Sequence, residues 1–261
     1  MFSTIWHGLI FDPIYNLLIA LINLIPGGDV GVAIIFLVVI VKVLLLPLSI
    51  KATRTQMKMT AVQGELKELQ EKYKDDKQTL GAKTLELYRK YNVNPFSSVL
   101  VMLIQIPVIF ALFFAIRELP VINESLLYAF NYNPSDLIQM KLFGVIDITK
   151  GGSQMAAVIL GLLAASTQYI QTSFILKQNQ AAQEKAEKEN VGKKDTVSFS
   201  TEFAKGMQVQ MKYVMPVMTF VISFQLGAAI AIYWTISNIF AIAQEYYMRK
   251  KVRGTYSPQT G

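Results

Sequence analysis

Long apolar runs separated by polar, charged segments dominate this sequence. The four longest runs cover residues 30–50, 96–116, 155–176 and 213–248. Because about 20 apolar residues in an α-helix cross the hydrocarbon core of a bilayer, each of the first three runs predicts one membrane span. The fourth run is too long for one span, so we expect two short spans that turn near residues 225–227. The pattern therefore predicts five spans.

A shorter apolar run, residues 14–25, precedes the first span and directly follows Pro13. It is too short to cross a bilayer, and it lacks the cationic start and the small-residue cleavage site of a signal peptide. We interpret it as an interfacial helix on the outer surface of the membrane. Residues 26–28, Pro-Gly-Gly, are expected to end this helix, and Asp29 is expected to cap the first span.

Lysine and arginine residues are unevenly distributed among the segments that connect these runs. Residues 51–90 contain ten of them, residues 177–212 contain seven, and the tail after Met248 contains four. Residues 1–30 contain none. Because Lys and Arg gather on the cytoplasmic side of membrane proteins, we expect the N-terminus outside and the C-terminus in the cytoplasm. Five spans satisfy this alternation, whereas four would place the basic tail outside.

These patterns predict an all-α, polytopic membrane protein with five transmembrane helices, an outer interfacial N-terminal helix and a cytoplasmic helical hairpin. The alternation places both strongly basic loops on one face of the membrane. The expected segments are an extracytoplasmic N-terminal segment (1–28), a first span (29–51), the cytoplasmic helical hairpin (52–93), a second span (95–117), an extracytoplasmic loop (118–152), a third span (153–177), a cytoplasmic loop (178–211), a fourth span (212–226), a fifth span (228–248) and a basic cytoplasmic tail (249–261).

The first basic segment has a helical pattern of its own. Within residues 52–93, apolar side chains recur three and four positions apart, with Lys and Glu between them. Asp75 and Asp76 divide this pattern into two runs and offer an N-cap for the second. We therefore expect two amphipathic helices joined by a short turn. Two interpretations stay open: a solvated extension into the cytosol, or a docking surface for a partner.

One charged residue, Lys42, lies inside an otherwise apolar run. The polar end of the predicted span at Lys51 is roughly 13 Å of helix away, too far for the side chain to reach comfortably. A lysine at this depth costs about 2.5–3.5 kcal/mol on insertion scales. No Asp or Glu lies in the middle of any predicted span. We therefore expect a wet, polar cavity around Lys42, the alternative being a buried pair with another side chain.

Other polar residues inside the predicted spans are candidates for lining the same cavity. Each of them alone also suits an interhelical hydrogen bond. Prolines at positions 47, 107 and 216 interrupt three of the runs and are expected to kink the helices. The candidates for lining this cavity, besides Lys42, are Gln105, Gln168, Gln171, Thr172, Ser237, Asn238 and Trp234.

Composition agrees with a membrane protein and removes several function classes. Hydrophobic residues make up 52% of the chain, charged residues 16%, and the mean hydropathy is +0.37. The chain has no cysteine and one histidine, His7, so thiolate zinc sites and Ser–His–Asp catalysis are not expected. Nucleotide-binding and metallopeptidase motifs are also missing. We expect no cofactor, no metal and no enzymatic activity.

Several segments together resemble the YidC family of membrane protein insertases. The segment K-V-L-L-L-P-L-S-I-K-A-T-R-T-Q-M-K-M (42–59) resembles the family's first core span and the loop after it. L-Y-R-K-Y-N-V-N-P-F-S-S-V-L-V-M-L-I-Q-I-P-V-I-F-A-L-F-F (87–114) resembles its second span. M-P-V-M (215–218) and I-Y-W-T-I-S-N-I-F-A-I-A-Q (232–244) resemble its last two spans. The resemblance extends from about residue 10 to residue 250.

The resemblance also implies a role for Lys42. In that family a basic residue, usually arginine, precedes the proline of the first span by five positions and lies in a hydrophilic groove open to the cytoplasm and the lipid. Lys42 and Pro47 occupy these positions here. Lysine keeps the charge but lacks the bidentate fork of arginine. The sequence also departs from the family at residues 97–99, Ser-Ser-Val, and at residues 226–229, Leu-Gly-Ala-Ala.

Such a resemblance implies an insertase and chaperone in the bacterial plasma membrane. Its expected partners are nascent membrane proteins, the ribosome and the lipid bilayer, and no specific DNA. Whether it acts alone or beside a Sec translocon is left open. One alternative is a small channel or transporter with Lys42 as an anion site. A second is a membrane-embedded hydrolase that uses Lys42 as a base.

Overall fold

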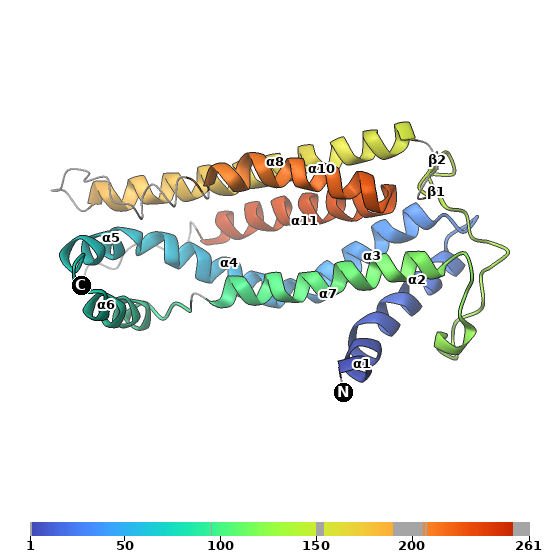
Figure 1. Cartoon of the computed structure of the whole chain (residues 1–261), viewed down its shortest axis with the longest axis horizontal. Coiled ribbons are helices and arrows are strands. Elements are labelled where there is room, and N and C mark those ends of the chain that lie inside the picture. Colours follow the sequence, from blue (N-terminus) through green and yellow to red (C-terminus); the bar gives the residue numbers. More distant parts are fainter. Residues whose placement is uncertain (1, 95, 150–153, 190–205, 207, 253–261) are drawn as a thin grey trace. The chain divides into compact units, whose positions relative to one another are not determined.

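The computed structural model of the chain describes residues 2–94, 96–149, 154–189, 206 and 208–252. These residues are mostly α-helical, as predicted, with one small two-stranded sheet (Figure 1). They fall into two compact units, which are described separately. The first consists of residues 1–45, 102–169 and 215–241, and the second of residues 46–101, 170–214 and 242–261.

The N-terminal helix is longer than the sequence predicted. Helix α1 (Phe2–Trp6), a π-helical segment η1 (His7–Phe11) and α2 (Asp12–Leu24) follow one another without a break. Pro13 lies in the first turn of α2, where a residue without an N–H is tolerated, so it does not start a new element. The prediction of a helix that begins at residue 14 and is too short to span was wrong. The helical stretch Thr4–Leu24 is long and apolar enough to cross a membrane, and its interfacial position stays a prediction.

One face of α2 forms the centre of the first unit's core. Tyr15, Leu18, Ile19 and Ile22 are each 0% exposed, and their spacing of three and four positions puts them on one side of the helix. This side packs against α3 (Val30–Leu44) in a single hydrophobic cluster that includes residues of α7 (Phe96–Glu118) and α11 (Ala228–Val252). The core therefore includes α3, the first helix that the sequence predicted to enter the membrane.

The first predicted span, 29–51, is broken in the structure. Helix α3 ends at Leu44, and α4 (Leu46–Ala61) begins a new helix after Leu45. Pro47 explains the break, because its ring excludes a continuous helix through the preceding turn and it fits the first turn of the next one. Asp29 caps α3 as expected, since its Oδ1 accepts a 2.9 Å hydrogen bond from Val32 N. The first apolar run is therefore two helices rather than one.

Three further long helices follow. Helix α7 (Phe96–Glu118) contains Pro107, and α8 (Gln154–Glu189) runs on beyond the expected end of the third span. A π-helical segment η3 (Gln210–Val214) leads into α10 (Met215–Leu226), and Gly227, with φ of 108°, separates α10 from α11 (Ala228–Val252). This break coincides with the turn expected near residues 225–227. Half of the loop predicted at 178–211, and most of the tail predicted at 249–261, lie outside the described residues.

The number of spans is not decided by helix length. Among the described residues, two helical stretches are long and apolar enough to cross a membrane, Thr4–Leu24 and Gln154–Gln180. A third is obtained if the pair formed by α3 and α4 counts as one broken span. The five-span arrangement and its orientation therefore stay predictions.

The predicted extracytoplasmic loop contains structure that the sequence did not indicate. A 3-10 turn η2 (Glu124–Leu126) follows α7, and strands β1 (Lys141–Leu142) and β2 (Ile146–Asp147) pair antiparallel with Leu142 opposite Ile146. The strands are too short for a periodic pattern to reveal them. The end of this loop, residues 150–152, lies outside the described residues.

In the second unit, the region predicted as a helical hairpin, 52–93, contains the last residues of α4 followed by two short helices. They are α5 (Gln63–Lys72) and α6 (Lys77–Lys90). Glu65 on α5 accepts hydrogen bonds from the Tyr91 hydroxyl and, at 3.4 Å, from Lys90 Nζ, which ties the end of α6 to α5. The position of these two helices on the cytoplasmic side stays a prediction.

We expect the start of α6 to depend on pH through Asp76. Its carboxylate accepts hydrogen bonds from Thr79 N (3.0 Å) and Thr79 Oγ1 (2.6 Å), and these bonds lower the pKa of Asp76 below its ordinary value of 3.8. Because the pKa is lower in the folded state, the stabilisation is fully present above the ordinary value. It is lost as the pH falls through the lowered one. Hydrogen exchange at Thr79 N, corrected for its intrinsic rate, should accelerate over that range.

The matched control for this prediction is Asp76→Asn. Asparagine is a good N-cap and does not titrate, so exchange in this variant should not change with pH beyond the intrinsic rate. An equal acid-induced acceleration in the variant would show that another group controls the start of α6.

Candidate functional site

Lys42 and Gln105, both predicted as groove residues, meet within the first unit. Lys42 Nζ on α3 donates a 3.1 Å hydrogen bond to Gln105 Oε1 on α7. Within the described part of the chain, Gln105 is the hydrogen-bond partner of Lys42, and no carboxylate forms an ion pair with it. An ammonium group has three donors, so Lys42 retains donors for water or for an acidic ligand. Its charge is therefore solvated by one neutral amide rather than neutralised.

The break after α3 gives Lys42 a position that the sequence did not predict. Lys42 lies in the last turn of α3, two residues before the helix ends, rather than in the middle of a long span. Carbonyl groups at a helix C-terminus carry partial negative charge and stabilise a nearby cation by about 0.3–1 kcal/mol. The break caused by Pro47 thus offsets part of the cost of burying the ammonium group.

A small cavity adjoins the Lys42–Gln105 pair. The volume open to the centre of a water molecule is about 10 Å³, which is room for roughly one water. The cavity walls are mostly apolar, whereas the sequence predicted a wet, polar cavity. Besides Lys42 and Gln105, the lining residues are Ile14, Leu37, Val38, Val41, Val108, Leu112 and Tyr233.

The other predicted groove residues do not all gather at this cavity. Asn238 is buried on α11, and its Nδ2 donates to Thr167 Oγ1 (3.2 Å) and Ala164 O (3.4 Å) of α8. Asn238 therefore joins two helices. Ser237 is buried next to it on α11. Of the candidates on α8, Gln168 belongs to the first unit, whereas Gln171 and Thr172 belong to the second.

Of the neighbouring aromatic residues on α11, Tyr233 lines the cavity and Trp234 does not. The sequence predicts Trp234 as the groove residue of this pair. Successive residues of an α-helix point about 100° apart, so only one of two neighbours can face a narrow cavity. Trp234 is half-buried and packs against the core from another side. The apolar lining residues carried no signal in the sequence, because they look like any other residue of an apolar helix.

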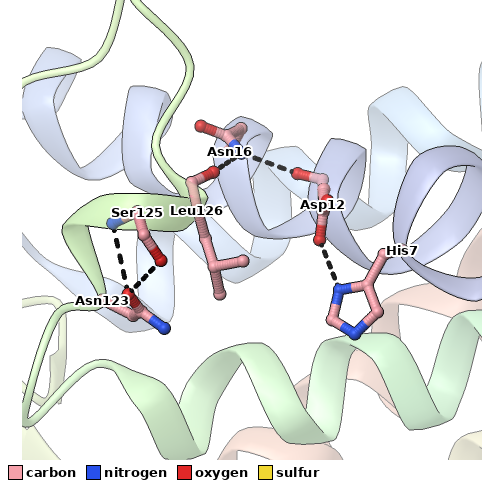
Figure 2. A network of polar contacts seen from close by, with 6 residues as sticks. All are labelled: His7, Asp12, Asn16, Asn123, Ser125 and Leu126. Atoms are coloured by element: carbon pink, nitrogen blue, oxygen red, sulfur yellow. Dashed lines mark hydrogen bonds and ion pairs between the residues drawn. The ribbon is translucent and has the colours of Figure 1, made fainter. Parts of the chain in front are cut away.

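A second polar cluster links α2 to the loop after α7 (Figure 2). Asn16, 1% exposed, donates from Nδ2 to Asp12 O (2.9 Å) and to Leu126 O (2.8 Å). His7 Nδ1 lies 2.9 Å from Asp12 Oδ1. The described residues contain no group of three or more His, Cys, Asp or Glu side chains that could hold a metal ion. This cluster therefore fastens the loop to the helix.

Comparisons with known proteins identify the family. The family described as 60Kd inner membrane protein matches residues 21–255. A protein of Fusobacterium nucleatum subsp. nucleatum named membrane protein insertase YidC is 29% identical over 226 residues, which are 86% of this chain and 88% of that protein. A protein of Clostridium tetani with the same name is 30% identical over 225 residues, 86% of this chain and 84% of that protein.

A further relative is the membrane protein insertase YidC 1 of Streptococcus pyogenes serotype M3. It is 32% identical over 221 residues, which are 83% of this chain and 66% of that protein. The matched segment includes α3, α7 and α11, so Lys42, Gln105 and Tyr233 all lie within it. This membrane-embedded chain therefore belongs to the 60Kd inner membrane protein family, the family of the insertases named YidC.

Proposed function

We propose that this protein is a membrane protein insertase and chaperone, which transfers segments of nascent membrane proteins from the cytosol into the bilayer. The observation that carries the proposal is the state of Lys42: a half-buried ammonium group at the end of an apolar helix, bonded to the neutral amide of Gln105. The names of its relatives support the same role. Lys42 and Gln105 form the proposed client contact, with Tyr233 beside them.

The chemistry of this pair suits a transient contact with an acidic client. A hydrogen bond between an ammonium group and a carboxylate is roughly twice as strong as one between neutral groups, so an incoming carboxylate can replace Gln105 as acceptor. Apolar walls lower the local dielectric constant and strengthen the attraction. Because no carboxylate of the described residues forms an ion pair with Lys42, the client does not have to displace one of them. Release returns the ammonium group to Gln105.

Insertion of the client's apolar helix supplies the driving force. Each apolar side chain that moves from water into lipid is stabilised by the hydrophobic effect, and about 20 of them form one span. The costly step is the passage of the polar tail across the hydrocarbon core. A cation part of the way along this path reduces that cost for an acidic tail. The mechanism therefore requires neither a nucleotide nor a metal.

The remaining parts of the chain have proposed roles in receiving the client. Helices α5 and α6, on the cytoplasmic side in the predicted orientation, would contact the client first. At the start of the C-terminal tail, the exposed Lys250 would attract the phosphates of ribosomal RNA, whereas Arg249 is already paired with Glu245. The proposed location is the bacterial plasma membrane, with the N-terminus outside. The groove also includes Gln168, Ser237, Asn238 and Trp234 of the same unit in this proposal, whereas the assignment of Gln171 and Thr172, which belong to the second unit, stays a prediction.

The test of the function is the insertion of a single-span client with a short acidic N-terminal tail. The client is synthesised in a cell-free system in the presence of liposomes that contain the purified protein, and protection of the tail from protease measures its insertion. We expect clearly more protected client than with empty liposomes. An equal yield in the two samples would contradict the insertase function. Anion flux without any client would instead favour the channel, with Lys42 as its anion site.

A further inference from the structure

A short β-hairpin within the loop between α7 and α8 has an unusual turn. Val145 N donates to Leu142 O across it at 3.3 Å, and its two central residues, Phe143 and Gly144, have φ angles of 55° and 71°. Two positive φ angles define a type I′ turn, for which Asn-Gly or Asp-Gly is the usual sequence. A phenylalanine at the first central position is disfavoured, because a bulky side chain crowds the backbone there. Its presence therefore requires a reason outside the turn.

The hairpin is fastened to the beginning of α3. The buried carboxylate of Asp29 caps α3 with Oδ1 and accepts a 2.7 Å hydrogen bond from Gly144 N with Oδ2. Two backbone hydrogen bonds attach the segment just before β1 to the start of α3. Val30 N donates to Gln139 O (3.0 Å), and Gln139 N donates to Gly28 O (2.9 Å). The turn of the hairpin is therefore one side chain away from the point where α3 begins.

Glycine at position 31 makes this close approach possible. A Cβ atom at Gly31 would lie 2.7 Å from Leu142 Cβ and 2.8 Å from Leu142 Cα, so any larger residue would push the first strand away. The hairpin is consequently held in one position relative to α3 by side-chain, backbone and packing contacts. The turn of the hairpin is therefore held at a fixed position along the axis of α3.

The tip of the hairpin is apolar and exposed. Phe143 is 68% exposed and Val145 is 83% exposed, on either side of Gly144. The preceding segment of the same loop exposes Phe130 (67%) and Tyr132 (81%), and Asn23 on α2 holds Tyr132 through a 2.9 Å hydrogen bond to its carbonyl. Tyrosine gathers at the boundary between lipid headgroups and hydrocarbon, and phenylalanine occurs on the buried face of segments that lie in this interface.

We propose that Phe143 and Val145 insert into the lipid interface of the membrane face at which α3 begins. Their position supports lipid as the occupant, because α3 is the apolar helix predicted to enter the membrane near Val30, and Asp29 bonds both to it and to Gly144. Two side chains also offer far less area than a stable protein partner requires. The anchor sets the depth of α3 in the bilayer. It goes beyond the proposed function and does not depend on any client.

A single-cysteine label tests this proposal directly, since the chain has no cysteine of its own. Val145→Cys carries an environment-sensitive fluorophore in liposomes of phosphatidylethanolamine and phosphatidylglycerol. Quenchers are lipids with a nitroxide near the headgroup, or iodide present on both sides of the membrane. Asp136→Cys, at an exposed position of the same loop, is the matched control. At position 145 we expect blue-shifted emission, strong quenching by the shallow nitroxide and weak quenching by iodide. At position 136 we expect no blue shift, weak quenching by the nitroxide and strong quenching by iodide.

A second variant isolates the contribution of the phenylalanine ring. Phe143→Asn, added to Val145→Cys, suits the positive φ angle, so the hairpin is kept while the ring is removed. We expect the label to become accessible to iodide, approaching the level of the Asp136→Cys control. Iodide quenching equal to that control with Phe143 intact would overturn the proposal. Protection from both iodide and the nitroxide lipids would also overturn it, because it would indicate a protein contact instead.

Discussion

Replacing Lys42 by leucine should remove most of the insertion of a client with an acidic tail, and replacing it by arginine should restore it. Leucine removes the ammonium group that attracts the client's carboxylate, whereas arginine supplies a cation of similar reach. A hydrogen bond to a charged group contributes about 1.5–3 kcal/mol. If this contact lowers the barrier to tail transfer, its loss slows insertion by roughly tenfold to a hundredfold. Initial rates of protease protection, at equal protein density in the liposomes, measure the effect.

Two controls separate the charge at the cavity from charge in general. Lys51→Leu removes the same group from an exposed position on α4 and should leave insertion nearly unchanged. A client with a neutral tail should insert at similar rates with the wild-type protein and with Lys42→Leu. Equal rates for the acidic client in the wild type and Lys42→Leu would contradict the proposed role of Lys42.

Gln105 provides a complementary test of the same idea. Its Oε1 lies 3.1 Å from Lys42 Nζ, so Gln105→Glu places a carboxylate within ion-pair distance of the ammonium group. An internal ion pair competes with the client for Lys42, and insertion of the acidic client should fall although the lysine is intact. Full insertion by Gln105→Glu would indicate that the client does not need the charge of Lys42 to be free.

The sequence predicted those features that depend on local chemistry. Asp29 was predicted to cap the first apolar helix, and the structure shows its bond to Val32 N. Asp76 was predicted to start the second helix of the basic segment, and it does. The helix break near residues 225–227 appears at Gly227. Caps and glycine turns act within a few residues, so a short stretch of sequence is enough to identify them.

Features that depend on contacts between distant residues were missed or misplaced. Pro47 was expected to kink a span, and the helical path does break there, but the resulting position of Lys42 at the C-terminus of α3 was not predicted. Tyr233 rather than Trp234 lines the cavity, because the orientation of α11 about its axis depends on its neighbours. The hairpin at residues 141–147 depends on Asp29 more than on strand propensity. None of these outcomes leaves a periodic signal in the sequence.

The site itself was therefore predicted only in part. The pairing of Lys42 with Gln105 follows the expectation that polar residues inside apolar helices find one another. Asn238 follows the same rule but pairs with a different helix, at Thr167 of α8. Sequence shows which residues need polar partners, whereas the packing of the helices decides which partners they obtain.

Replacing Asn16 by leucine should cause a large loss of stability for a single change outside the cavity. Asn16 is 1% exposed, although the sequence places it in an apolar run. Its Oδ1 accepts from Tyr128 N (2.7 Å) and from Asn131 Nδ2 (2.9 Å), while its Nδ2 donates to Leu126 O (2.8 Å). Leucine has a similar size but leaves these groups without their partner. Each unsatisfied buried group costs about 1–3 kcal/mol, so the free energy of unfolding should fall by roughly 2–5 kcal/mol.

The control for this prediction is Asn23→Leu on the same helix. Asn23 makes one hydrogen bond, to Tyr132 O, at an exposed site, so its loss should cost no more than about 1 kcal/mol. Thermal unfolding in detergent compares the two variants, and hydrogen exchange at residues 126–131 shows whether the loop has detached from α2. If Asn16→Leu and Asn23→Leu lowered the melting temperature equally, with no faster exchange in this loop, the network around Asn16 would not hold it. A selective loss would show that one buried amide attaches the loop after α7 to the helix at the centre of the core.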